Sequence, residues 1–232
     1  MPMRQADNPA GRSANRWSMV MAKPRSAEIT LYHAPNTRSL GALTLLEELG
    51  VPYRLHVLNL KAGEQHQPAY LAINPMGKVP ALLHGDAVIT EQAAVFMYLA
   101  DLYPEAGLAP PIGDPLRGPY LRWMVFYGSC FEPALADRAL QRAAPPRATS
   151  PYADFDTMFA VLEQQLARGP YLLGTRYSAA DVLWAGALRW TTGFKLVPAT
   201  PAITAYLERV TTRPAFQRAR AEDAKLAAVQ SA

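Results

Sequence analysis

A proline-rich segment divides the sequence into two parts whose residue patterns differ. Four prolines fall between residues 104 and 115, and such a cluster is typical of a linker. Before it, short apolar runs that predict β-strands alternate with helical patterns, whereas only helical patterns follow it. The sequence therefore predicts an α/β domain over residues 27–103, the linker over residues 104–115, and an all-helical domain over residues 116–232.

The first part has the order strand, helix, strand, helix, strand, strand, helix. Its strand patterns cover residues 28–32, 53–57, 79–83 and 87–89, and its helical patterns cover residues 40–49, 69–73 and 91–103. The initial strand, helix and strand favour a parallel pair with a right-handed crossover. Gly85-Asp86 between two apolar runs indicates a hairpin. Helical patterns in the second part cover residues 116–139, 152–167, 179–192, 201–212 and 214–229.

The composition excludes several classes of protein. Half of the 232 residues are apolar, which is enough to bury a core and rules out disorder as the main state. No apolar run approaches the roughly 20 residues that span a bilayer, so we expect no membrane helix. The single cysteine, Cys130, excludes an internal disulfide, a cysteine-rich zinc site and a CxxC redox pair. The four histidines lack metal-ligand spacing, so we expect no metal.

The net charge of +4 is concentrated at the N-terminus. Residues 1–26 carry five basic side chains against Asp7 alone, so the charges of the remaining residues balance. This balance argues against a nucleic-acid partner. Residues 1–26 show no helical or strand period and lack the apolar stretch of a secretory signal, so we expect a flexible extension. The lone cysteine fits a reducing compartment, and we expect a cytoplasmic protein.

The order of elements in the first part, with Pro80 opening the third strand, resembles the thioredoxin fold. With a helical domain behind it, the chain resembles a glutathione S-transferase. Local matches in matching order are the segments 31–39 (LYHAPNTRS), 74–82 (NPMGKVPAL), 89–94 (ITEQAA), 177–182 (YSAADV) and 213–216 (RPAF). The likeness covers roughly residues 27–226 and looks most like the bacterial beta and theta-like branches. It implies a homodimer that binds glutathione in the N-terminal domain.

The resemblance implies that the segment around Pro80 and the start of the next helix bind glutathione. The Val79–Pro80 bond is expected to be cis, which would turn the backbone of Val79 toward the cysteinyl part of the ligand. Glu91 would meet the ligand's ammonium group, and Gln92 would donate to its carboxylate beside the positive end of the helix. The family commonly has serine where Gln92 stands. In the alternative without a ligand, Thr90 only caps the helix.

The resemblance also places Gln65 and Lys78 where theta-like members reach the glycyl carboxylate of glutathione. His66 is an alternative to Gln65, because the match is loose by one residue at this point. Polar side chains of surface loops often bind nothing, so a purely solvated role is the alternative for these residues.

The group that activates the thiol is expected in the loop before the first helix. The thiolate is the nucleophile, and a hydrogen bond to the charged form lowers the pKa of the thiol. Theta-like members use a serine here, and beta-branch members carry a cysteine where Arg38 stands. We rank Thr37 and Ser39 first, then Asn36 through its amide and Arg38 through its charge. Ser39 could instead cap the helix, and Tyr32 could approach from the side.

An aromatic stripe marks the first helix after the linker. Tyr120, Trp123, Phe126, Tyr127 and Cys130 share one helical face by their spacing of three and four. The resemblance places this helix across a cleft from glutathione, so we assign Trp123 and Tyr127 to an apolar electrophile. The other three are assigned to the core or to a dimer partner.

Residues 178–181 (SAAD) form a capping box with aspartate in the fourth place. The same signature resembles a folding motif of the family. We therefore expect Asp181 to be structural and not catalytic.

The predicted function is conjugation of the glutathione thiolate to a small apolar electrophile. A second enzymatic possibility is glutathione-dependent reduction of disulfides or peroxides at the same site, with glutathione supplying the thiols. A third is a non-catalytic binding protein on the same fold, which Arg38 and Gln92 keep open because they replace more usual residues.

Overall fold

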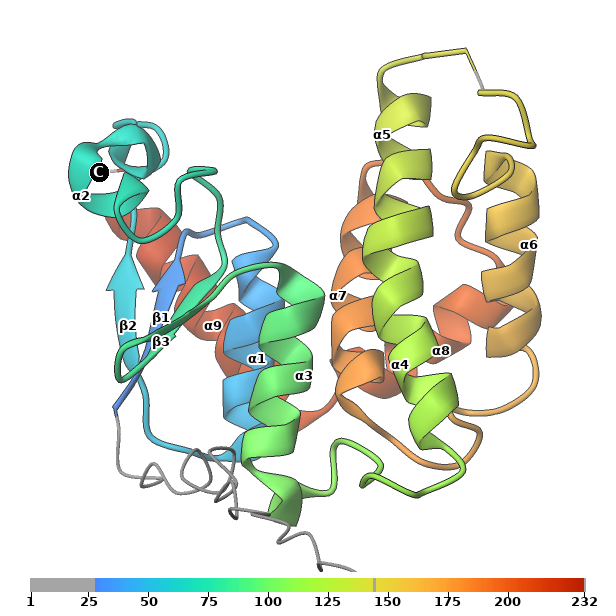
Figure 1. The fold of residues 1–232 in the computed structure, drawn as a ribbon, viewed down its shortest axis with the longest axis horizontal. Coiled ribbons are helices and arrows are strands. Elements are labelled where there is room, and N and C mark those ends of the chain that lie inside the picture. Colours follow the sequence, from blue (N-terminus) through green and yellow to red (C-terminus); the bar gives the residue numbers. More distant parts are fainter. Residues whose placement is uncertain (1–27, 144, 232) are drawn as a thin grey trace, which may run out of the picture.

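The computed structural model describes residues 28–143 and 145–231. The predicted flexible extension, residues 1–26, lies outside the described residues. Figure 1 shows a smaller part built around a sheet beside a bundle of helices. The first part contains β1 (Ile29–His33), α1 (Ser39–Leu49), β2 (Arg54–Val57), α2 (Pro68–Leu71), β3 (Ala81–His84), β4 (Ala87–Ile89) and α3 (Gln92–Leu102).

The sheet has the strand order β2-β1-β3-β4. β1 pairs in parallel with β2, placing Leu31 opposite Leu55, and antiparallel with β3, placing Leu31 opposite Leu82. β3 and β4 form the predicted hairpin, whose turn holds Gly85 at a φ of 58°. This positive φ is readily adopted by glycine. The parallel pair and the hairpin are both as predicted.

The two faces of the sheet carry different apolar clusters, because successive side chains of a strand point in opposite directions. Leu31 is fully buried in the main core with residues of α1 and α3. Its neighbour Tyr32 packs in a smaller cluster with Tyr70 of α2. Helices therefore cover both faces, which confirms the thioredoxin-like class of the N-terminal part.

Helices joined by loops make up the second part, and among its described residues only two isolated bridges have a β pattern. It contains α4 (Arg117–Phe126), a π-helical turn (Tyr127–Phe131), α5 (Glu132–Ala139), α6 (Phe155–Leu166), α7 (Ala179–Gly193), α8 (Pro201–Thr211) and α9 (Pro214–Val229). The fold class of an α/β domain followed by an all-helical domain is confirmed.

The predicted helix over residues 116–139 is interrupted by the π-helical turn. Pro133 follows this turn directly. A proline has no N–H to donate to the carbonyl four residues earlier, so a regular helix is disfavoured at this point. A wide turn places Tyr127 and Glu132 on the side that faces the first part of the molecule, and π turns are often found at functional sites.

Helix α7 runs through the core of the helical part and is capped as predicted. The backbone N–H of Ser178 donates to the Asp181 carboxylate over 2.9 Å, and the capping box is complete. Trp184 of α7 meets Trp123 of α4 edge to face at a centroid distance of 5.7 Å. Its indole N–H donates to the Trp123 carbonyl over 3.0 Å.

The last helix, α9, returns to the N-terminal part and lies behind α1 in Figure 1. Arg218 of α9 donates to Glu47 at the end of α1 over 2.7 Å. The amide of Gln230 donates to the Leu58 carbonyl over 3.1 Å. These contacts hold α9 against the N-terminal part, more than 100 residues earlier in the chain. Helix α9 also contacts the loop after β1, where Asp223 accepts from the Asn36 N–H.

Candidate active site

The loop after β1 folds its two hydroxyl groups inward. Ser39 is fully buried, and its Oγ accepts from the Ala34 N–H over 3.1 Å. Thr37 Oγ1 donates to the Ala34 carbonyl over 2.7 Å and lies 2.7 Å from Ser39 Oγ. Arg38 is the N-cap of α1 and makes no side-chain cap hydrogen bond. The hydroxyls therefore stabilise the loop in this conformation.

Helix α9 holds the same loop from the other side. Asp223 is buried, and one of its oxygens lies 3.1 Å from Nε2 of the fully buried His33. His33 Nδ1 lies 2.8 Å from Ser39 Oγ. The Asn36 N–H donates to the Asp223 carboxylate over 3.2 Å, with Asn36 at a φ of 59°. A residue other than glycine in a left-handed conformation needs stabilising contacts, and the hydrogen bond to Asp223 is one of them.

Ser39, His33 and Asp223 have the order of a catalytic triad but not its accessibility. The Ser39 hydroxyl has no exposed surface, so a substrate cannot reach it in this structure. The three side chains form a hydrogen-bonded network that positions the loop. The exposed residues of this loop are Asn36 and Arg38.

All six side chains assigned to glutathione binding line one cavity of about 890 Å³. They are Gln65, Lys78, Val79, Pro80, Glu91 and Gln92. His66, the alternative to Gln65, lines it as well. The Val79–Pro80 bond is cis, as predicted. The structure thus brings together residues that the sequence separates by up to 27 positions.

Helix α3 begins at this cavity with an uncapped first turn. Its N-cap is Glu91, at a φ of 65°, and no side chain of the described residues caps the turn. Thr90 therefore does not act as the cap that we considered as an alternative. Free N–H groups and the positive end of the helix dipole favour a carboxylate at this position.

Gln92 connects the two parts of the molecule. Its Oε1 lies 2.8 Å from the Tyr127 hydroxyl oxygen, and its Nε2 donates to the Arg38 carbonyl over 3.2 Å. Gly41 leaves the space that this amide needs, since a Cβ at position 41 would lie 2.9 Å from Gln92 Nε2.

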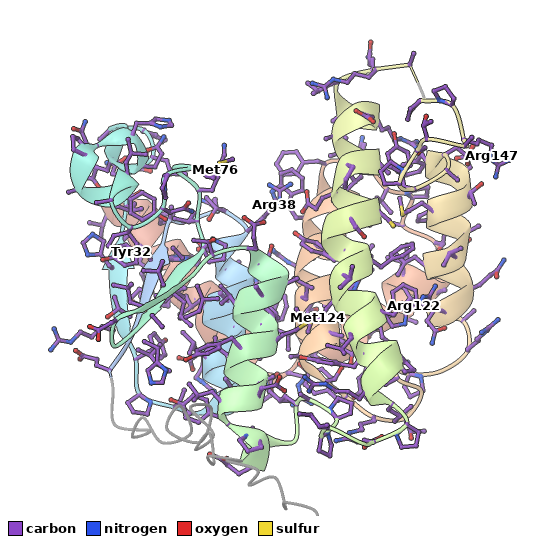
Figure 2. All side chains as sticks on the ribbon, in the orientation of Figure 1. Tyr32, Arg38, Met76, Arg122, Met124 and Arg147 are labelled. Carbon is purple, nitrogen blue, oxygen red and sulfur yellow. The ribbon has the colours of Figure 1, made fainter. Side chains whose placement is uncertain are left out.

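Arg38, Glu132 and Tyr127 form a charged cluster at the junction of the two parts. The Arg38 guanidinium donates to both Glu132 oxygens, over 2.7 and 2.6 Å, and the Tyr127 hydroxyl also donates to Glu132. The hydrogen bonds that Arg38 donates to Glu132 raise the pKa of Arg38. Burial first, and then the negative charge of Glu132, raise the pKa of Tyr127 well above its ordinary value. Both groups stay protonated near neutral pH. Figure 2 shows Arg38 between Met76 of the first part and Met124 of α4.

We expect Glu132→Ala to lower the free energy of unfolding by about 1–2 kcal/mol, because it removes the acceptor of two hydrogen bonds from Arg38, which join the two parts, and of one from Tyr127 within the helical part. Urea unfolding followed by circular dichroism measures the loss. The control is Glu222→Ala, whose ion pair with Lys225 is exposed at 3.4 Å and should contribute little. Equal losses for the two variants would contradict a linking role for Glu132.

A second cavity of about 650 Å³ lies between α1, the end of α7 and α9. Its walls include Leu40, Trp190, Phe194 and Phe216, together with Arg189 and Arg220. Asn36, Thr37, Arg38 and Tyr127 line both cavities. The loop after β1 therefore stands where the two cavities meet.

Two assignments from the sequence need correction. Ser39 lines neither cavity and is buried, so it does not face a ligand. Nor does it cap α1, because Arg38 occupies that position. Trp123 is 1% exposed and packs against Trp184 in the core, so it lines neither cavity. Tyr127 does line both cavities through its hydroxyl end.

Several residues of the site were not predicted from the sequence, among them Glu132, Trp190 and Asp223. Asp223 follows the buried residues Phe216 and Ala219 of α9 at helical spacing, which is its only local signal. Glu132 and Trp190 stand in helical patterns that give no indication of a cavity.

The described residues contain no group of three or more His, Cys, Asp or Glu side chains placed to hold a metal ion. None of the helices in the described part of the chain is long and apolar enough to cross a membrane.

Comparisons with known proteins agree with this geometry. Residues 27–101 match the family model "Glutathione S-transferase, N-terminal domain", and residues 154–214 match "Glutathione S-transferase, C-terminal domain". Disulfide-bond oxidoreductase YfcG of Escherichia coli is 30% identical over 82% of this chain and 94% of its own length. Glutathione S-transferase 3 of Zea mays is 30% identical over 83% of this chain and 93% of its own length.

Solved structures resemble the whole described fold. A glutathione transferase from Methylococcus capsulatus superposes with a TM-score of 0.72 at 33% identity, covering 85% of this chain and 99% of that one. A glutathione transferase homologue from Sulfitobacter, solved with bound glutathione, has a TM-score of 0.69 at 32% identity, covering 84% and 98%.

Proposed function

The chain belongs to the glutathione S-transferase family, and we propose that it transfers the thiolate of glutathione to a small apolar electrophile. The observation that carries the proposal is the meeting of two cavities at Asn36, Thr37 and Arg38. The larger cavity has the polar groups that a tripeptide needs, and the smaller one has aromatic walls. Two reactants held in this way would react with the advantage of proximity.

Glutathione fits the larger cavity by its charges. The γ-glutamyl carboxylate would lie at the uncapped start of α3, and Glu91 would receive the ammonium group. Val79 precedes β3, whose ladder starts at Ala81, so its peptide groups are available to the cysteinyl part. Lys78 and Gln65 would meet the glycyl carboxylate. The bound glutathione of the Sulfitobacter homologue supports this reading.

The thiolate needs a hydrogen-bond donor at the loop. We place the Asn36 amide first, because its side chain is exposed to both cavities and makes no hydrogen bond within the described residues. The Thr37 hydroxyl comes second, since its proton is directed to the Ala34 carbonyl. Arg38 adds positive charge, although Glu132 offsets much of it.

The reaction forms one bond and breaks another. The sulfur of the thiolate attacks the electrophilic carbon, a C–S bond forms, and the leaving group departs with its electron pair. The thiol proton is released to solvent when the thiolate forms. Stabilising the thiolate and orienting the two reactants are the tasks left to the protein.

Two measurements test the function. Retention of the full chain on immobilised glutathione, with elution by free glutathione, tests binding. Conjugation of 1-chloro-2,4-dinitrobenzene, followed by absorbance, tests transfer. Retention without conjugation would favour a non-catalytic binding protein, and absence of retention would contradict the proposal.

Gly41→Ala should weaken glutathione binding several-fold. The added Cβ would displace the Gln92 amide, which is the flexible end of a side chain, and would press on Phe96 at 3.3 Å. The higher helix propensity of alanine contributes about 1 kcal/mol. This gain should offset the strain against Phe96, so the free energy of unfolding should change little. Calorimetric titration with glutathione gives the affinity. Gly118→Ala, where a Cβ would meet nothing within 4 Å, is the control.

Glutathione-dependent reduction of disulfides is the second candidate, supported by the relative named as a disulfide-bond oxidoreductase. The loop after β1 carries no cysteine, and Cys130 is half-buried with its Sγ toward the Pro151 carbonyl. Glutathione would have to supply both thiols. Reduction of 2-hydroxyethyl disulfide, measured beside conjugation with the same protein sample, distinguishes the two reactions.

We also propose a cytoplasmic homodimer without metal, nucleic-acid or membrane partners. Val88 of β4 and Val125 of α4 are exposed large apolar residues that a partner subunit could cover. Light scattering after size exclusion would test the dimer.

A further inference from the structure

Two arginines face the smaller cavity from different helices. Arg189 lies near the end of α7 and Arg220 lies in the middle of α9, and both line the cavity. Arg220 is half-buried and Arg189 is more exposed. Neither forms an ion pair within the described residues, unlike Arg213 and Arg218 on α9.

The acidic side chains of this cavity are engaged elsewhere. Glu132 binds Arg38 through both oxygens. Asp223 attracts Arg189, but its oxygens accept from the Asn36 N–H and contact His33. Burial and then repulsion by Arg220 lower the pKa of Arg189. Neither Arg189 nor Arg220 is paired with a carboxylate within the described residues, and the cavity is lined by three arginines against two acidic side chains. A bound anion would stabilise this excess of positive charge.

The rest of the cavity is suited to an aromatic ring. Trp190 is 40% exposed and Phe194 is 65% exposed, and their rings lie 4.7 Å apart between centroids. Arg38 lies 5.3 Å over the Trp190 ring and holds its outer face. Exposed aromatic side chains in a cavity favour a ligand with a flat ring.

We propose that the electrophile of this enzyme is an aromatic compound carrying a carboxylate or sulfonate, which Arg189 and Arg220 bind while its ring packs against Trp190 and Phe194. This inference rests on the proposed function and specifies the substrate class of the same site. The anionic group lies away from the junction of the cavities, so the reactive carbon faces the loop at Thr37.

The test compares an anionic electrophile with a neutral one of the same shape. The probes are 4-chloro-3,5-dinitrobenzoate and its primary amide. In each the glutathione sulfur replaces chloride on the ring, with a C–S bond formed, a C–Cl bond broken and the thiol proton released to buffer. Each kcat/KM is divided by the uncatalysed rate with glutathione, which removes the difference in intrinsic reactivity. The measured quantity is this corrected kcat/KM for the anion divided by the corrected kcat/KM for the amide.

Arg220→Gln and Arg189→Gln should each lower this ratio about tenfold, the order expected for a charge-assisted hydrogen bond. Arg220→Lys should retain part of the ratio, because it keeps the charge. Arg218→Gln is the matched control: it removes an arginine from the same helix, but one that is paired with Glu47. An unchanged ratio in both cavity variants, or an equal fall in Arg218→Gln, would overturn the inference.

Equilibrium binding separates this inference from the proposed function. Calorimetry gives the Kd of each probe in the absence of glutathione, when no transfer occurs. If conjugation fails with both probes but the two cavity variants weaken binding of the anion selectively, the transferase proposal falls and the anion site stands. If transfer proceeds and the Kd ratio does not depend on Arg189 or Arg220, the transferase proposal stands and the anion site is wrong.

Discussion

Asp181→Ala is expected to lower the free energy of unfolding by about 3 kcal/mol. The carboxylate is fully buried and accepts from the Leu172 N–H and the Ser178 N–H, each over 2.9 Å. It also accepts from the Ser178 and Tyr206 hydroxyls, each over 3.1 Å. Alanine would leave these buried donors without an acceptor, which costs more than the loss of an exposed cap.

Urea unfolding and residual activity together test this structural role. Asp154→Ala is the control, because Asp154 caps α6 through the Thr157 N–H at a more exposed position and should cause a clearly smaller loss. The turnover of the folded fraction should stay close to that of the original chain in both variants. Loss of turnover at unchanged stability would mean that Asp181 takes part in the reaction.

The effect of Asp181→Ala should also depend on pH. Burial outweighs the hydrogen bonds and raises the pKa of Asp181 to about 6, above the value of about 4 expected in the unfolded chain. The folded state then binds the proton more tightly, so the stability that this group contributes is full below about pH 4 and declines as the pH rises through about 6. The difference between the two proteins should therefore widen from pH 7 to pH 5.

Features set by local pattern could be predicted from the sequence. The capping box at Ser178 and the hairpin at Gly85 each depend on a few neighbouring residues. The cis bond before Pro80 was expected from the resemblance to the family. The order of strands and helices followed in the same way from apolar periodicity. The residues of the larger cavity were assigned from the resemblance to the family, and the structure brings them together because the strands and helices that carry them have the expected order.

The direction in which single side chains point could not be predicted, because it depends on contacts with distant residues and on local breaks in helices. Trp123 and Tyr127 stand one helical turn apart, yet Trp123 packs against Trp184 in the core while the Tyr127 hydroxyl reaches Glu132 beyond the π-helical turn at residues 127–131. Asp223 meets Asn36 across 187 positions, and no local pattern encodes that contact. Burial of Ser39 follows from the same contact, through His33.

The loop after β1 provides the second large expected effect, on the pKa of bound glutathione thiol. A hydrogen bond to a charged group contributes about 1.5–3 kcal/mol, or about one to two pKa units. Removing the Asn36 amide should raise the thiol pKa by that amount and slow conjugation near neutral pH in proportion to the lost thiolate. Glutathione affinity should hardly change, because the rest of the ligand keeps its contacts.

Asn36→Gly is the suitable change, since glycine accepts the φ of 59° without strain and keeps the N–H that donates to Asp223. Thiolate absorbance of the bound ligand in the ultraviolet, followed across pH, gives the titration. Thr37→Val tests the second donor and should cause a smaller rise. Ser39→Ala should lower stability and leave the titration in place, because its hydroxyl faces His33 and Ala34.

The three variants decide which group stabilises the thiolate. A shift in Asn36→Gly alone supports the amide, and a larger shift in Thr37→Val would reverse the order that the structure favours. A shift in Ser39→Ala equal to that of Asn36→Gly would show that the loop changes conformation when glutathione binds and turns a buried hydroxyl toward the sulfur. If no variant moves the titration, the donor is Arg38 or the backbone N–H groups at the start of α1, whose dipole also favours the charged form.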